Sequence, residues 1–184
     1  MDYYSIIKKF YVPNTKAFNL LVNHGEQVAK KALKVAQNVL HYDPNLEFIE
    51  EASMLHDIGV CFTNAHSIGC EGKNPYLLHG ILGRALLENI NLQKHALVCE
   101  RHVGVGITLQ DIKAFNLPLP LRDMSPITIE EKIICFADKF FSKNEIEHEK
   151  SIEEILNNLE KYGEDKVAKF KAWLKMFRYN EDQK

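Results

Sequence analysis

The sequence lacks the features that mark membrane proteins, secreted proteins and disulfide-rich scaffolds. None of its apolar runs approaches the roughly 20 residues that a bilayer-spanning helix requires. The first residues show no charged start, apolar middle and small-residue cleavage site of the kind found in a signal peptide. The four cysteines form no Cys-x-x-Cys pair and no dense pattern of disulfide partners. We therefore expect a reduced, cytoplasmic protein that does not bind membranes.

The sequence also lacks an excess of charge of either sign. It has 23 basic and 25 acidic residues, which gives a formal net charge of −2. Such a chain has no broad positive field to recruit nucleic acid, so we expect no nucleic-acid partner. The 184 residues, 46% of them hydrophobic, suffice for one domain with a complete core.

Helical periodicity dominates what is present. From Asn14 to about Leu40, apolar residues recur with gaps of three and four positions, as on one stripe of an α-helix. Asn14 is a candidate N-cap, and Pro44 ends this helix. By similar arguments we expect further helices at Leu46–Ile58, Tyr76–Glu88, Leu92–His102, Thr108–Asn116, Thr128–Phe141, Ser151–Tyr162 and Glu164–Tyr179.

Breaks between these helices are marked by glycine and proline. The segment from Val60 to Pro75 contains Gly69 and Gly72 and is expected to be an irregular loop. Prolines also interrupt the helical pattern at residues 117–120. No segment alternates convincingly between apolar and polar residues as a strand would. The sequence therefore predicts an all-α, single-domain helical bundle.

Six polar residues are placed on the apolar sides or ends of the expected helices. An imidazole or carboxylate in such a place is costly unless it is paired or bound to a metal. Together they could hold two cations, with Asp57 shared between them. The six are His24, His56, Asp57, His79, His102 and Asp138.

Nitrogen and oxygen ligands of this kind suit Fe, Mn, Co, Ni or Zn, whereas Mg fits less well with so many imidazoles. Open coordination positions are typical of a catalytic site rather than of a structural zinc site. The other histidines have simpler interpretations. His41 and His148 are expected at the surface, and His95 in the core. Cys99 and Cys135 are expected to be small core residues.

Three short segments that contain the candidate ligands resemble motifs of the HD-domain superfamily of metal-dependent phosphohydrolases. They are His24 in His-Gly-Glu-Gln-Val-Ala, the motif Leu-His56-Asp57-Ile-Gly, and Asp138 in Phe-Ala-Asp-Lys-Phe. His79 and His102 resemble the two additional histidines of the dinuclear branch of that superfamily. The resemblance covers about residues 15–143. Residues 100–104, 117–120 and 128–133 are also similar to a bacterial and archaeal subgroup with the His-Asp-Ile-Gly variant.

The resemblance implies an all-α HD domain and hydrolysis of a phosphate ester. We accordingly expect one domain over residues 1–184, with its core at about 15–143 and the helices of 151–179 packed on it. One metal would bind His24, His56, Asp57 and Asp138. A second would bind Asp57, His79 and His102, which are the predicted catalytic residues, and the two ions would activate water.

The sequence departs in two places from motifs found in the superfamily, and these departures narrow the expected substrate contacts and the branch to which the chain could belong. Val60 replaces the lysine that often follows the His-Asp-Ile-Gly motif, so one phosphate contact is missing. The Gly-Tyr-Pro element of the cyclic-dinucleotide branch is absent from the sequence.

The expected partner is a small phosphorylated substrate, such as a nucleotide. Candidate substrate contacts are His66, Lys73, Arg84, Arg101 and Lys139.

Two alternatives remain beside the phosphohydrolase. A branch of the same superfamily uses a similar six-ligand set to hold two irons and oxidise a C–H bond, and ligands alone do not choose between the two chemistries. A non-enzymatic metal- or nucleotide-binding module is the other alternative. The complete set of ligands argues against that module.

Overall fold

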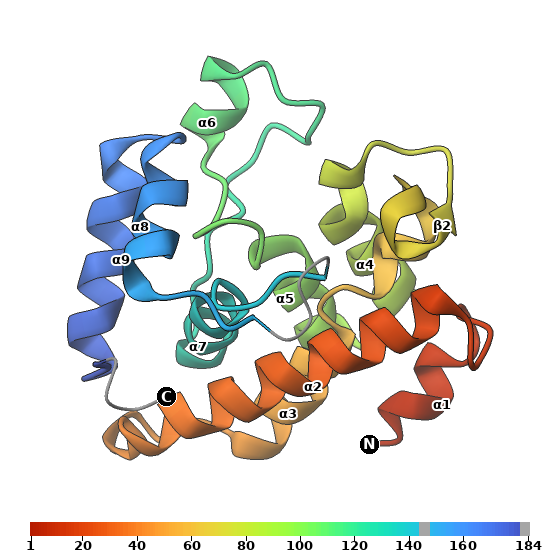
Figure 1. Cartoon of the computed structure of the whole chain (residues 1–184), viewed down its shortest axis with the longest axis horizontal. Helices are drawn as coiled ribbons and strands as arrows, with labels where there is room; N and C mark the ends of the chain where they lie inside the picture. Colours follow the sequence, from red (N-terminus) through yellow and green to blue (C-terminus); the bar gives the residue numbers. More distant parts are fainter. Residues whose placement is uncertain (144–147, 181–184) are drawn as a thin grey trace.

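A computed structural model describes residues 1–143 and 148–180. In these ranges the chain is helical, and its only strands are the two-residue β1 (Asn64–Ala65) and β2 (Cys70–Glu71). The all-α prediction is confirmed (Figure 1). The described α-helices are α1 (Tyr3–Ile7), α2 (Lys16–Gln37), α3 (Leu46–Leu55), α4 (His79–Glu88), α5 (Gln93–Arg101), α6 (Leu109–Ala114), α7 (Ile129–Asp138), α8 (Ile152–Glu160) and α9 (Glu164–Met176). No helix in the described ranges is long and apolar enough to cross a membrane.

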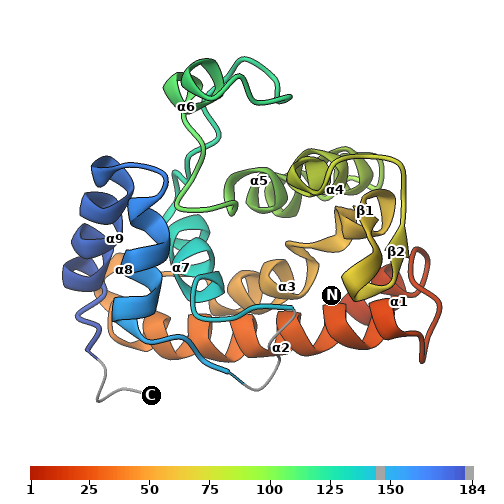
Figure 2. The same cartoon turned by 45° about the horizontal axis from the view of Figure 1, so that its top comes forward.

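Helix α2 is the longest element and lies along one side of the molecule, with α3 and α7 packed on it (Figure 2). Its predicted apolar stripe is buried as expected. The predicted N-cap of α2, Asn14, was wrong by one residue. Thr15 has extended backbone angles, and its side chain accepts a hydrogen bond from the Phe18 amide. Asn14 has a φ of 64°, which serves the turn before the helix rather than the cap.

The helices end earlier than the periodicity predicts, and these ends place the polar residues. Helix α3 ends at Leu55, so that His56 is its C-cap, and α5 ends at Arg101, with His102 as its C-cap. Asp138 is the last residue of α7. Helices α3, α5 and α7 contact one another. The negative ends of three helix dipoles thus bear three of the six predicted ligands, which favours a cation there.

Two apolar clusters hold the molecule together. One joins α2, α3 and α7 to the C-terminal helices through the rings of Phe136, Phe140, Phe170 and Phe177, all of them buried. Phe136 stacks on Phe170 with ring centroids 5.0 Å apart. The other cluster joins α1, the first half of α2, the end of α3, and helices α4 and α5. The six predicted ligands lie on helices, or at helix ends, that contribute to these two clusters.

The segment predicted as an irregular loop contains short structure that its composition did not predict. Strands β1 and β2 pair antiparallel, with Ala65 opposite Cys70. Single 3-10 turns lie before, between and after them: η2 (Ile58–Phe62), η3 (His66–Ile68) and η4 (Tyr76–Leu78). Another 3-10 turn, η1 (Leu40–Tyr42), follows α2. Two-residue strands are too short to leave an alternating pattern in the sequence.

Residues 106–128 form a lobe that carries α6 and projects from the body of the molecule (Figure 2). A backbone bridge between Ile107 and Met124 closes its base, and Ile112 and Met124 are buried within it. The side chains of Lys166 on α9 and Asp111 on α6 form an ion pair, with Nζ 2.6 Å from Oδ2. This contact ties the lobe to the C-terminal helices.

Candidate metal centre

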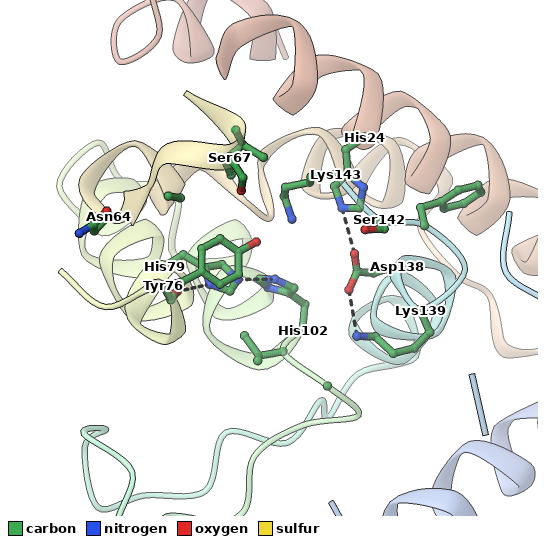
Figure 3. Close-up of a pocket in the computed structure, with 15 residues that line it drawn as sticks. His24, Asn64, Ser67, Tyr76, His79, His102, Asp138, Lys139, Ser142 and Lys143 are labelled. Atoms are coloured by element: carbon green, nitrogen blue, oxygen red, sulfur yellow. Dashed lines mark hydrogen bonds and ion pairs between the residues drawn. The ribbon is translucent and has the colours of Figure 1, made fainter. Parts of the chain in front are cut away.

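Four of the six predicted ligands form one buried group. Asp138 Oδ1 lies 3.0 Å from His24 Nε2, and Asp57 Oδ2 lies 3.1 Å from His56 Nε2 and 3.3 Å from His24 Nε2. The donor atoms of all four residues lie within 4.8 Å of one another, which is close enough for one cation. Figure 3 shows His24 and Asp138 facing each other across the site.

The other oxygen of Asp57 belongs to a second group. Asp57 Oδ1 lies 3.3 Å from His79 Nε2 and 3.4 Å from His102 Nε2. These three residues also place their donor atoms within 4.8 Å of one another. The carboxylate of Asp57 thus directs one oxygen into each group, as the sequence-based hypothesis of a shared ligand requires.

Three of the imidazoles are oriented by the backbone of the preceding helical turn. In each, Nδ1 lies 2.5–2.8 Å from the carbonyl oxygen three residues earlier, which can only accept a hydrogen bond. Nδ1 therefore donates, and Nε2 faces the site, where its lone pair is available as a ligand when the ring is neutral. The three donor–acceptor pairs are His56 with Ser53, His79 with Tyr76, and His102 with Cys99.

The donor atoms fit a cation better than they fit one another. His79 Nε2 lies 3.1 Å from His102 Nε2, and His56 Nε2 lies 3.2 Å from His24 Nε2. Two facing lone pairs repel unless a proton or a metal lies between them. Both carboxylate oxygens of Asp57 are buried and have no hydrogen bond of normal geometry within the described residues. A buried carboxylate is costly without a balancing cation, which in this structure is the Lys143 ammonium and in a loaded site would be a metal ion.

The electrostatics of the site keep both carboxylates ionised. Burial acts to raise the pKa of Asp57, but the Lys143 ammonium and the His56 imidazolium outweigh it and hold the pKa well below its usual value. Burial is likewise outweighed at Asp138 by Lys139 and His24, so its pKa is also low. Burial lowers the pKa of His79 to about 3. Burial acts to lower the pKa of His56, but Asp57 and Asp138 outweigh it and raise the pKa to about 10, so this ring is protonated in the metal-free site. The two ionised carboxylates and the neutral His79 are already in the forms that metal ligation requires, whereas His56 would lose its proton on binding a cation.

Lys143 is a member of the site that the sequence analysis missed. Its ammonium group contacts Asp57 Oδ2, and its side chain is only 12% exposed. Burial acts to lower its pKa, but Asp57 outweighs burial and raises it above the usual lysine value. Lys143 lies five residues beyond the end of α7, outside any helical stripe, so no periodicity could have identified it.

A cavity of about 450 Å³ opens over both groups. It is lined by His24, His79, His102 and Asp138 and by two lysines, Lys139 and Lys143 (Figure 3). The remaining polar residues around it are Asn64, Ser67, Tyr76 and Ser142. Part of its wall comes from β1 and η3, within the segment that was predicted to be an irregular loop.

The predicted substrate contacts are only partly in place. Lys139 lines the cavity, with Nζ 3.3 Å from Asp138 Oδ2. His66 and Lys73 are exposed and do not line it, because neighbouring residues of the same loop, Asn64 and Ser67, occupy the wall instead. Those two assignments are corrected accordingly.

Two predicted phosphate contacts are engaged elsewhere. Arg84 lies 2.5 Å from Glu100 and 2.8 Å from Glu88. Arg101 donates to both oxygens of Glu131, at 2.8 and 3.0 Å. Since neither arginine lines the cavity, we correct the assignment of both: they are partners of buried carboxylates.

The histidines given simpler interpretations lie outside the site. His41 is exposed, and His148 is exposed and forms an ion pair with Glu154 at 2.9 Å. His95 is partly buried and pairs with Glu51 at 3.3 Å, so it is not the plain core residue that we expected. Cys99 and Cys135 are fully buried, as predicted.

The model of the HD-domain family matches residues 21–143, which is more than half of the chain. The chain belongs to the HD family. The match includes all six residues of the two groups, and this family is one of metal-dependent hydrolases. The HD assignment made from the motifs is thereby confirmed, whereas the number and identity of the metals are not fixed by it.

Curated relatives match this chain over very different shares of their own lengths. The chain is 33% identical over 145 residues to "Uncharacterized protein MJ0778" of Methanocaldococcus jannaschii, covering 77% of this chain and 76% of that one. It is 34% identical over 131 residues to a tRNA (cytidine(56)-2'-O)-methyltransferase of Picrophilus torridus, and 26% identical over 162 residues to that of Thermoplasma volcanium. These matches cover 71% and 88% of this chain but only 34% and 42% of the two methyltransferases. No solved structure matches.

Proposed function

We propose that this HD domain is a metal-dependent phosphohydrolase that acts on a small phosphorylated compound, such as a nucleotide. The observation that carries the proposal is the position of Asp57. Its two oxygens face two separate groups of nitrogen and oxygen donors at 3.1–3.4 Å, directly beneath a cavity that contains two lysines. Such an arrangement suits two cations and an anionic substrate at once.

The proposed ligands follow from the two groups. His24, His56, Asp57 and Asp138 would hold one divalent transition-metal ion, and Asp57, His79 and His102 would hold the other. When bound, such ions lower the pKa of water and stabilise charge on phosphoryl oxygens. Nitrogen-rich donors favour Fe, Mn, Co, Ni or Zn over Mg.

The chain's own residues supply binding and orientation. Lys139 and Lys143 present ammonium groups to the cavity, where they would attract the phosphate oxygens. The backbone carbonyls behind three of the imidazoles fix each ring, so that Nε2 stays directed to the reacting centre. The four imidazoles and Asp57 are at most 4% exposed, so bulk water has little access to the ligand atoms except through the cavity.

The size of the cavity supports a small substrate rather than a polymer. A volume of about 450 Å³ matches the range of ordinary small-molecule sites. The near-neutral composition gives no broad basic surface for a nucleic-acid backbone. The tRNA methyltransferase names belong to relatives more than half of whose length this chain does not match. Methyl transfer is therefore no part of this proposal.

A substrate panel tests the proposal. Protein purified without chelator is analysed for metal and then assayed with Mn²⁺, Fe²⁺, Co²⁺, Ni²⁺, Zn²⁺ and Mg²⁺ added separately. The substrates are phosphomonoesters and phosphodiesters, nucleotides included. We expect phosphate release with at least one transition metal and its loss on treatment with a chelator. Failure with every metal, together with uptake of O₂ on a small organic compound, would replace the hydrolase with the oxygenase alternative.

A further inference from the structure

A second and larger cavity, of about 760 Å³, lies beside the metal centre. Its walls come from the α6 lobe, from the segment after α5, and from α8 and the start of α9. Most of this lining is apolar, including Val105, Ile107, Leu117, Ile155 and Leu159. We call this space the lobe cavity.

The lobe cavity adjoins the cavity over the metal centre. Val103, Gly104 and Lys139 line both. Gly104 has a φ of 66°, and a side-chain carbon built on it would meet no atom within 4 Å, so that the space at the junction is open. A molecule whose phosphate lies over the metal ligands would reach the lobe cavity by crossing this shared border of Val103, Gly104 and Lys139.

Two aromatic rings on the lining of the lobe cavity are largely uncovered. Phe115, just after α6, is 56% exposed, and Tyr162, just after α8, is 62% exposed. Rings exposed to this extent on a concave apolar surface are available to stack against a ligand. They belong to different elements of the cavity wall, the lobe and the C-terminal helices.

The charges around the lobe cavity favour an anionic occupant. Its lining includes Lys139, Lys150, Lys161 and Lys166, against a single carboxylate, Asp111, among the described lining residues. Asp111 is already paired with Lys166 at 2.6 Å. Lys139 is likewise paired with Asp138, at 3.3 Å. The lysines of the described lining still outnumber its carboxylate, and this excess favours an anion near the junction of the two cavities.

We propose that the lobe cavity binds the organic part of the substrate, and that this part is large, mainly apolar and contains a planar ring. The proposal rests on the proposed function, because it takes the phosphate to be bound over the metal ligands. It narrows the substrate class from any small phosphate ester to an ester of a ring-containing alcohol. Leu117 and Leu159 would contact its apolar body, and Phe115 and Tyr162 its ring.

A binding experiment tests this without metal or turnover. The probe is 8-anilinonaphthalene-1-sulfonate, an anionic aromatic dye, titrated into the full chain in the presence of chelator. We expect the double variant Phe115→Ser/Tyr162→Ser to bind it roughly tenfold more weakly, since each exposed ring contributes to stacking. The matched control is Leu121→Ser, because Leu121 is 72% exposed on the same lobe and does not line the cavity. Equal binding by the wild type and the double variant would overturn the proposal.

A second arm uses the ester itself. 1-Naphthyl phosphate should displace the dye from the wild type, whereas inorganic phosphate at the same concentration should not. With the activating metal, the double variant should raise the KM for 1-naphthyl phosphate about tenfold, while the KM for glycerol 1-phosphate stays within twofold. Equal increases for both substrates would overturn the proposal.

The two arms separate the two hypotheses. If no ester is hydrolysed under any metal, the proposed function fails, and the displacement experiment still decides whether the cavity binds the organic group. If hydrolysis is seen but the double variant changes neither dye binding nor the KM for the naphthyl ester, the lobe cavity is not the substrate site.

Discussion

The ammonium group of Lys143 contacts Asp57 Oδ2, the same oxygen that faces His24 and His56. An ammonium and a divalent cation cannot both occupy that position. Lys143 therefore neutralises Asp57 in this structure and would compete with a metal ion for the carboxylate. With a metal at Asp57, the lysine would be able to turn toward the cavity that it already lines and meet an anionic substrate.

The variant Lys143→Met should bind metal more tightly than the wild type. Removing the competing cation should increase Mn²⁺ affinity roughly tenfold, equivalent to about 1.4 kcal/mol. Isothermal titration of chelator-treated protein measures this directly. Lys30→Met, at an exposed position of α2, is the control and should leave the affinity unchanged. Unchanged or weaker binding by Lys143→Met would show that the lysine does not compete.

Removing the shared carboxylate should have the largest effect on the metal centre. Asp57→Ala should abolish both metal retention and phosphate release, because it removes a donor from each group. Metal analysis after gel filtration gives the stoichiometry, and circular dichroism checks the fold. Asp123→Ala is the control, since Asp123 is exposed. Two metals retained by Asp57→Ala would rule out this ligand assignment.

The second group can be tested separately from the first. His79→Ala and His102→Ala should each lower the metal content from two equivalents toward one, because the four-residue group is left intact. His41→Ala, at an exposed position, should retain the wild-type content. If both site variants keep two metals while remaining folded, these histidines contact the substrate or serve only packing.

The ion pair between Lys166 and Asp111 should make the attachment of the lobe sensitive to acid. Burial acts to raise the pKa of Asp111, but Lys166 and the backbone of Thr108 outweigh it and lower the pKa below 3.8. Because the folded-state pKa is the lower one, the stabilisation is present above pH 3.8 and is lost as the pH falls through the folded-state value.

The variant Asp111→Asn measures this contribution. The amide oxygen of the asparagine can still accept the hydrogen bond from the Thr108 amide at the start of α6, but it carries no charge for Lys166. At pH 7 we expect a loss of about 1 kcal/mol in the free energy of unfolding, as for a partly exposed ion pair. At a pH below the folded-state pKa the wild type and the variant should be equally stable. Denaturant unfolding at several pH values provides the comparison, and a difference that does not shrink with acid would contradict the assignment.

Helices α4 and α5 approach each other closely at Gly80, where an added Cβ would lie 2.5 Å from the carbonyl oxygen of Cys99. That oxygen accepts the hydrogen bond that orients His102. Gly80→Ala should therefore cost about 1–3 kcal/mol of stability through overpacking and also weaken binding of the second metal. Gly25→Ala, where the nearest atom would lie 3.2 Å away, should be milder and should not change metal content. Thermal unfolding and metal analysis together distinguish the two effects.

The sequence by itself determined the helical class and identified the six residues that the fold brings together. Helical periodicity is a local property, and a histidine or aspartate on an apolar stripe signals a special environment wherever the helix packs. The ends of the helices were less predictable, because the last turn depends on caps and on neighbouring elements. The actual cap at Thr15 and the early ends at Leu55 and Asp138 illustrate this.

The tertiary structure alone decided which charges serve the site and which are used elsewhere. Arg84 and Arg101 are engaged by Glu100 and Glu131, whereas Lys143 contacts Asp57 from a segment without periodicity. Each of these pairs joins residues at least 16 positions apart in the chain. A long charged side chain pairs with whatever opposite charge packing brings near it, and that neighbour is set by the arrangement of the helices rather than by local sequence.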